Sequence, residues 1–406
     1  NPANGNAPRP PGACRVLMLS TLGFAGAALA QGSDVEGDVI ADVRVRAEHV
    51  DRQGLDETLA VTWRARLGYE IKMPDGWSAL IEGEAVGHLN DDFSDSIDVV
   101  PGKAVVADPE ALELNRLQLA WTDTSANATL GRQRIVLDDG RFVGSVGFRQ
   151  NEQTFDAVRL GYTGSEAFNL QYVYIDKVHR IFGDESPVGE FESSSHVIRL
   201  AGETGVGNLV ATVLLLDLGG SGSASSQTYA VRWSGSWPLG DGLLSANIQA
   251  AEQSGYEGMG PTVDLGFQSY GATYSSGDIT FVGGLEILEG AAGQSFATPL
   301  ATLHAFQGWA DVFLNTPPSG IRDLSIGITG KGPPVISGAK PVSWAAFAHQ
   351  FESDNGGLTY GAEFDAVVRI PINEFLAIET KAAVFSGAAG GPPDTNKFWL
   401  ALEASF

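Results

Sequence analysis

The chain has 406 residues, with 49 acidic against 25 basic side chains and a net charge of -24. Because affinity for nucleic-acid phosphates comes from clustered Lys and Arg, this acidic balance argues against nucleic-acid binding. The 51 glycines and the lack of long amphipathic helical runs argue against a helical or multi-core soluble protein.

The first element in the chain is a predicted targeting signal over residues 1–30. Two arginines precede the apolar run Val16–Ala30, which ends in small residues typical of a cleavage site. The run is shorter than the ~20 residues that a membrane-spanning helix needs. Cys14 is the only cysteine and lies before this run, so the predicted mature chain, residues 31–406, has no thiol for a disulfide or a metal site.

Alternation of apolar and polar side chains dominates the rest of the chain. In Ala60–Lys72, every second side chain from Val61 to Ile71 is apolar and most of the others are polar or charged. A strand usually has about five or six residues, whereas a strand that crosses a membrane has ~9 to 11. The pattern therefore predicts membrane-spanning strands, and it recurs at residues 41–47, 228–234, 279–286 and 360–369.

Tight turns and long polar connectors separate these runs and tend to alternate along the chain. The long connectors are residues 89–110, 177–192, 291–320 and 387–396. Counting the runs gives about eighteen strands, an even number within the range of bacterial outer-membrane barrels. The predicted fold class is all-β, a transmembrane antiparallel β-barrel of about 18 strands with inward-folded loops. Two runs, residues 208–218 and 245–253, alternate poorly.

The last ten residues give the most specific local cue to location. Lys397–Phe406 alternates throughout and closes on an aromatic side chain, Phe406. This ending resembles the assembly signal of bacterial outer-membrane proteins, and in lipid only a closed sheet leaves no backbone edge unpaired. We therefore predict an integral protein of the Gram-negative outer membrane, with outer-membrane lipid and the barrel assembly machinery as partners.

Residues 131–160 invert the charge balance of the chain. Five arginines fall in this segment, and four acidic side chains accompany them: Arg132, Arg134, Arg141, Arg149 and Arg159, with Asp138, Asp139, Glu152 and Asp156. Glycines and the turn at Asp138 prevent one continuous strand or helix. Such a segment is usually a solvated loop, and the alternative is a strand, an inward-folding loop and a second strand.

If the chain is a barrel, the second interpretation gains support. Polar positions of the alternating strands, such as Arg64 and Arg66, would then face the lumen together with the arginines of residues 131–160. Because a guanidinium group keeps its charge in any setting, such arginines would set the field for passing ions.

Metal binding and catalysis find little support in the sequence. Four acids crowd together at Asp91, Asp92, Asp95 and Asp98, but their spacing fits no EF-hand loop and a solvated loop is the simpler interpretation. The six histidines lack a nucleophile elbow or a zinc-binding motif. Ser195 and His196 are adjacent, so on one strand they point to opposite faces. We expect no enzyme activity, no cofactor and no metal; a hydrolase at the barrel rim and an adhesin or structural barrel are the minor alternatives.

Three blocks of the sequence also resemble the alginate-export family of outer-membrane barrels. The blocks are residues 131–160, 176–184 and 296–324. The resemblance implies a monomeric barrel of about eighteen strands whose lumen is narrowed by inward loops and lined by arginines for an anionic polysaccharide. By position, the five arginines of residues 131–160 would form the constriction, and the four acids would hold them by paired hydrogen bonds.

This chain departs from the family's pattern because many acids are also predicted to face inward. The functional prediction is therefore an outer-membrane channel that passes small anions, or an anionic oligo- or polysaccharide, through an arginine-lined constriction. A general diffusion porin for small hydrophilic solutes is the alternative. Residues 296–311 are predicted to fold into or over the lumen, with a packed outer loop as the other possibility.

Overall fold

A computed structural model describes residues 35–165, 168–219 and 224–406 of the chain. The predicted signal, residues 1–30, lies outside the described residues. In the described part of the chain, no helix is long and apolar enough to cross a membrane.

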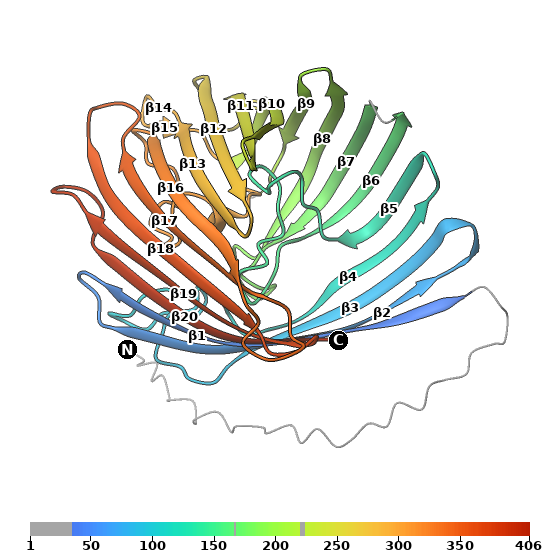
Figure 1. The fold of residues 1–406 in the computed structure, drawn as a ribbon, viewed down its shortest axis with the longest axis horizontal. Helices are drawn as coiled ribbons and strands as arrows, with labels where there is room; N and C mark the ends of the chain where they lie inside the picture. The colour runs from blue at the N-terminus through green and yellow to red at the C-terminus, as the bar shows by residue number, and fades with distance from the viewer. Residues whose placement is uncertain (1–34, 166–167, 220–223) are drawn as a thin grey trace, which may run out of the picture.

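Eighteen antiparallel strands form one closed sheet, and the strand order around the wall follows the chain (Figure 1). The last strand pairs with the first, with Asp42 opposite Ser405 and Arg52 opposite Thr395, so the sheet has no open edge. The predicted barrel and its strand number are confirmed. The strands are β1 (Glu36–Arg52), β2 (Thr58–Lys72), β3 (Trp77–His88), β4 (Ala111–Thr122), β5 (Ala126–Gln133), β6 (Thr154–Ser165), β7 (Phe168–His179), β8 (Glu190–Thr204), β9 (Gly207–Leu216), β10 (Ser226–Leu239), β11 (Gly242–Ser254), β12 (Leu265–Ser276), β13 (Ile279–Leu288), β16 (Ile321–Gly332), β17 (Val342–Glu352), β18 (Thr359–Pro371), β19 (Leu376–Gly387) and β20 (Thr395–Ser405).

The alternation of the sequence becomes an apolar outer belt and a polar inner wall. On β2, Leu67 and Tyr69 face outward and are about half exposed, whereas Arg64 and Arg66 face inward and are buried. Aromatic side chains gather near the short-turn end, where Phe375 stacks on Phe406 with ring centroids 5.3 Å apart. An apolar belt with aromatic residues at its border is the outer surface that a lipid bilayer requires.

The two ends of the barrel differ in the length of their connections. Tight turns join β2 to β3, β10 to β11 and β12 to β13 at one end, where β1 begins and β20 ends. In the first of these turns, a Cβ atom on Gly76 would lie 2.0 Å from the carbonyl oxygen of Thr122, so only glycine fits. Long loops leave the opposite end, and short turns with long loops are typical of the periplasmic and extracellular ends of such barrels.

Two of the long loops fold into the barrel and pack against its inner wall. The first inward loop is residues 134–153 and the second inward loop is residues 296–320, so the segment 296–311 folds inward as predicted. Ile135 and Val143 of the first loop are fully buried in one apolar cluster with Leu214 of β9. This contact explains the poor alternation of residues 208–218, because the inner face of β9 is apolar where a loop covers it.

Candidate functional site

The two inward loops bind each other across the lumen through backbone hydrogen bonds. Gly144 N donates to Leu300 O (2.8 Å), and Thr302 N donates to Gly140 O (2.9 Å). A Cβ atom on Gly144 would lie 2.1 Å from the hydroxyl oxygen of Thr302, so the close approach requires glycine. The loops therefore form a single layer that narrows the channel.

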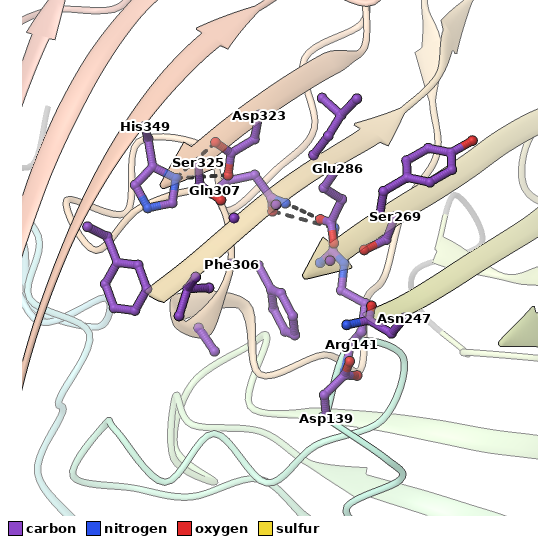
Figure 2. A pocket seen from close by; sticks show the side chains of 18 of the residues that line it. Asp139, Arg141, Asn247, Ser269, Glu286, Phe306, Gln307, Asp323, Ser325 and His349 are labelled. Atoms are coloured by element: carbon purple, nitrogen blue, oxygen red, sulfur yellow. Dashed lines mark hydrogen bonds and ion pairs between the residues drawn. The ribbon is translucent and has the colours of Figure 1, made fainter. Parts of the chain in front are cut away.

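Arg141 of the first loop contacts both the second loop and the barrel wall (Figure 2). Its side chain is fully buried, lies 2.8 Å from the carboxylate of Glu286 on β13 and donates to Gln307 Oε1 at 3.4 Å. The guanidinium also lies 4.6 Å from the ring centroid of Phe306. Gln307 in turn donates to Glu286. This ring of contacts fixes a charged group where the two loops and the wall meet.

Asp311 is the second anchor, because three cationic or hydrogen-bonding side chains converge on it. Arg149 of the first loop lies 3.0 Å away, Lys397 of β20 lies 2.9 Å away, and His304 Nδ1 lies 2.7 Å away. Although burial alone raises the pKa of Asp311, its cationic neighbours Lys397 and Arg149 and the contact with His304 hold the pKa well below its usual value. The carboxylate therefore ties the second loop to the first loop and to the wall.

His304 is held as a neutral ring by its surroundings. It stacks on Phe148 with ring centroids 3.5 Å apart, and burial lowers its pKa to about 3. Lys381 Nζ donates to Nε2 at 3.1 Å. Since an ammonium group can only donate, Nε2 accepts and the proton resides on Nδ1, facing Asp311.

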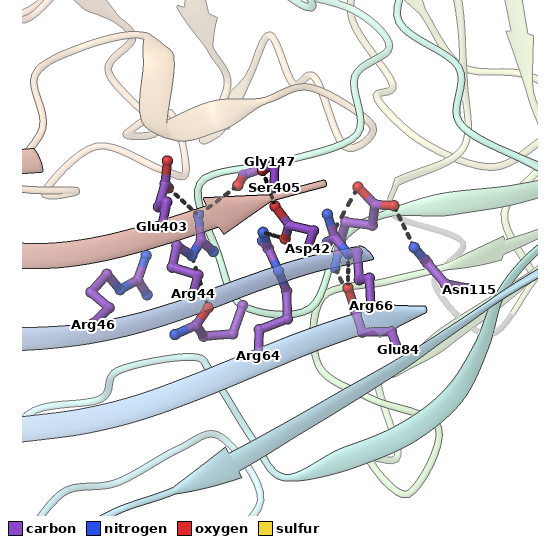
Figure 3. A network of polar contacts seen from close by, with 12 residues as sticks. Asp42, Arg44, Arg46, Arg64, Arg66, Glu84, Asn115, Gly147, Glu403 and Ser405 are labelled. Carbon is purple, nitrogen blue, oxygen red and sulfur yellow. Dashed lines mark hydrogen bonds and ion pairs between the residues drawn. The ribbon is translucent and has the colours of Figure 1, made fainter. Parts of the chain in front are cut away.

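A basic row on β1 and β2 seats the first inward loop (Figure 3). Arg44 donates to the carbonyl oxygens of Gly147 (3.1 Å) and Arg149, and Arg46 donates to that of Phe148 (2.5 Å). Arg64 donates to Asp42, and Arg66 donates to Glu84. All four guanidinium groups are buried, and each donates at least one hydrogen bond to the wall or to the first loop. Arg64 and Arg66, which the sequence predicts to line the path, are therefore packed against neighbouring side chains rather than open to the lumen.

A second basic row, on β6, β8 and β10, has part of its surface open to the lumen. Arg159 lies 2.6 Å from the side-chain amide of Gln171, which lies between it and Arg199 on the wall. Asp138, at the tip of the first loop, accepts from Arg199 (2.6 Å). Asp139 likewise accepts from Arg232 (2.9 Å), whose side chain is 24% exposed. The sequence pattern did not indicate that Arg199 faces inward, because the inner face of β8 also carries the apolar side chain of Val197.

The predicted acids hold arginines, but often different ones from those expected. Glu152 accepts a hydrogen bond from Arg134 and lies 3.4 Å from Arg66. The Arg134 side chain is about one-third exposed. Asp138 and Asp139 hold arginines of distant strands rather than arginines of their own segment. Arg141 and Arg149 lie in the inward loop as predicted, but both are buried.

Arg132 and Asp156 lie on the outer face of the barrel, so their predicted place in the constriction is wrong. They form a bidentate pair on the outward side of β5 and β6 (2.8 and 3.1 Å). Arg132 pairs across the sheet with Leu117, which faces lipid and is 50% exposed. The residues on either side of Asp156, Phe155 and Ala157, point inward to the apolar core. Since neighbouring strand residues face opposite sides, Asp156 faces outward.

The remaining candidate sites form no functional grouping among the described residues. Ser195 is buried on the inner face and bonded to Ser193 (2.8 Å), whereas His196 bonds to Tyr172 (2.9 Å) on the outer face. In the part of the chain that the structure covers, no group of three or more His, Cys, Asp or Glu side chains is arranged to hold a metal ion.

Cavities follow one another from the long-loop end to the short-turn end of the lumen. An upper cavity of about 460 Å³ lies among the long loops, and a middle cavity of about 320 Å³ lies beside β11, β12 and β13. Arg141 and Gln307 line both of them. A lower cavity of about 390 Å³ contains Arg232 and shares Asn247 and Thr273 with the middle cavity. The series forms a candidate path, in which Arg141 borders both the upper and the middle cavity.

Solved structures of outer-membrane proteins share the fold of this barrel. OccAB4 of Acinetobacter baumannii superposes with a TM-score of 0.71 at 14% identity, covering 93% of this chain and 100% of that chain. OpdK of Pseudomonas aeruginosa, solved with vanillate, gives 0.68 at 12% identity, covering 91% and 98%. OccK2 (OpdF) of P. aeruginosa, solved in complex with glucuronate, gives 0.63 at 14% identity, covering 91% and 98%. The fold is that of outer-membrane porins.

With this porin fold and its apolar belt, the chain is an integral outer-membrane protein. No family model matches the sequence, and no curated protein matches it either. The resemblance to the alginate-export family therefore stays an expectation, while the porin-like barrel that it implied is confirmed.

Proposed function

We propose that this porin is a channel for small organic anions, which cross the barrel past Arg141. The main support is the series of cavities that share Arg141 and Gln307 at one junction and Arg232 below it. A guanidinium group at such a junction stabilises a carboxylate as it loses water. Vanillate and glucuronate, present in two of the similar structures, are both small carboxylic acids.

The acidic side chains along the path explain how an anion can also leave it. Glu286 lies beside Arg141, and Asp323 lines the same middle cavity. A site that only attracted anions would hold them, whereas conduction requires binding weak enough to permit release. Mixed charges across a narrow lumen meet this requirement.

The size of the cavities favours small molecules over a polymer. Volumes of about 320 and 460 Å³ lie in the range of small-molecule sites, ~300 to 1,000 Å³. The two inward loops cross the lumen, and their mutual hydrogen bonds leave a series of chambers rather than a wide bore. An anionic polysaccharide and unselective diffusion of hydrophilic solutes are the competing functions, and each predicts a different result below.

Chemical modification of one engineered cysteine tests the path and its charge preference together. Ser269 lines the middle cavity beyond Arg141, so Ser269→Cys in a Cys14→Ser background should react with a thiol reagent added only at the long-loop end. We expect an anionic sulfonatoethyl methanethiosulfonate to react faster than its cationic trimethylammonium analogue and to reduce the current. The measurement is the rate of current loss in a planar bilayer.

Ile248 supplies the matched control, because it lies on the neighbouring strand β11, faces lipid and does not line the cavity. Ile248→Cys should leave the current unchanged with either reagent. Equal rates for both reagents at Ser269→Cys would favour a general diffusion porin, and faster reaction of the cationic reagent would refute the proposal.

A further inference from the structure

Arg180 is a cation at the long-loop end whose charge has no partner among the described residues. It follows β7 directly, and its guanidinium carbon lies 4.6 Å from the ring centroid of Phe182 and 4.3 Å from that of Phe191. One N–H group, on Nη1, donates to Val188 O at 2.8 Å. In the described part of the chain, no carboxylate lies within ion-pair distance of it.

The surroundings of Arg180 desolvate it without neutralising it. Burial lowers the pKa of this guanidinium to about 10, so the group remains cationic at neutral pH. Glu190 is the nearest acidic neighbour in the same cavity, but its carboxylate is held by Lys177 (3.1 Å) and His179 (3.0 Å). A half-buried arginine with unused donors is the arrangement that favours an external anion.

Apolar side chains form much of the walls around this cation. Arg180 lines the upper cavity together with Val188 and Phe313, and it lines a second cavity of about 200 Å³ together with Phe182. Leu314 borders both cavities. A ligand that placed an anionic group on Arg180 would therefore place the rest of its body against apolar and aromatic surface.

We propose that Arg180 forms a capture site for small amphipathic carboxylates, separate from the constriction and above it. The carboxylate binds the free N–H groups of Arg180, and the apolar body packs beside Phe182 and Leu314. Arg141 lines the same upper cavity, so a captured acid reaches the constriction without leaving that cavity. This inference rests on the proposed function, because it supplies the step before passage.

The chemistry of the walls sets the preference of the site. A benzoate ion can bury its ring against the apolar walls, whereas glucuronate carries hydroxyl groups that would lose water without new partners. Acetate offers the charge without an apolar body. The order of affinity expected at this site is therefore benzoate first, with acetate and glucuronate weaker.

Binding to the detergent-purified full chain tests the site without requiring transport. Titration calorimetry should show that Arg180→Gln weakens benzoate binding by about 10- to 100-fold, since a charge-assisted pair is lost. Phe182→Leu, which keeps the cation, should weaken benzoate binding while leaving acetate binding unchanged. Arg369→Gln is the matched control, because it removes a lumen arginine that is paired with Glu379 and Glu403. Folding of each variant is checked by the heat-dependent gel mobility of the barrel.

Two results would overturn the inference. One is benzoate binding to Arg180→Gln that equals binding to the unaltered chain, and the other is a Phe182→Leu variant that binds benzoate normally. Failure of the proposed function is a separate observation, because it would be seen as cation preference of the unaltered channel in bilayers.

Discussion

Replacement of Arg141 by Ala should widen the channel and reverse its ion preference. The Arg141 side chain lines both the upper and the middle cavity, and its guanidinium compensates the buried carboxylate of Glu286 at 2.8 Å. Breaking a buried pair by removing one partner costs about 3–5 kcal/mol, so the loops should also pack less firmly there. We expect single-channel conductance to rise severalfold and the reversal potential in a salt gradient to change sign towards cations.

The conservative variant Arg141→Lys separates charge from geometry. It keeps the cation but loses the planar fork, so it should retain anion preference with a smaller rise in conductance. If Arg141→Ala keeps both the conductance and the anion preference of the unaltered channel, then ions do not pass this residue.

Replacement of Asp311 by Ala should release the second inward loop from the wall. The carboxylate holds Arg149, Lys397 and His304 within 2.7 to 3.0 Å, and all of these groups are buried. Without it, two buried cations lose a shared partner, and the expected cost to loop docking is about 3–5 kcal/mol. Hydrogen exchange of residues 296–320 should then become faster by orders of magnitude, while exchange in the barrel strands stays slow.

Asp98→Ala is the matched control for this experiment. Asp98 is an exposed residue of another long loop and takes no part in the Asp311 contacts, so exchange in the second inward loop should not change. Asp311→Asn, which keeps the shape of the side chain but loses its charge, should give an intermediate rate. Unchanged protection of residues 296–320 in Asp311→Ala would show that apolar packing alone docks the loop.

The fold was predictable from the sequence because one physical constraint acts on almost every strand. A wall between lipid and water requires alternation, and β2 shows it over its whole length. The constraint weakens where an inward loop covers the inner face, as at Leu214 of β9, because both faces then become apolar. The strand boundaries also differ from the predicted ones. Lys177 and His179 belong to β7, whereas the sequence pattern places them in a connector.

The candidate site was less predictable, since its contacts join residues far apart in the sequence. Asp139 meets Arg232 and Asp311 meets Arg149, and no local pattern links these pairs. The error at Arg132 had a visible signal, because Arg132 shares its strand parity with Leu130, which faces lipid. The sequence therefore identified residues 131–160 as an arginine-rich segment. Only the structure shows which of its arginines face the lumen.

The reversal potential of the unaltered channel tests the central claim most directly. It is measured in a planar bilayer with a steep gradient of potassium acetate across the membrane. If small anions pass Arg141, acetate is more permeant than potassium, and the reversal potential has the sign expected for acetate. Added benzoate should then reduce the current through the channel. A potential of the sign set by potassium flow, unaffected by benzoate, would contradict the account.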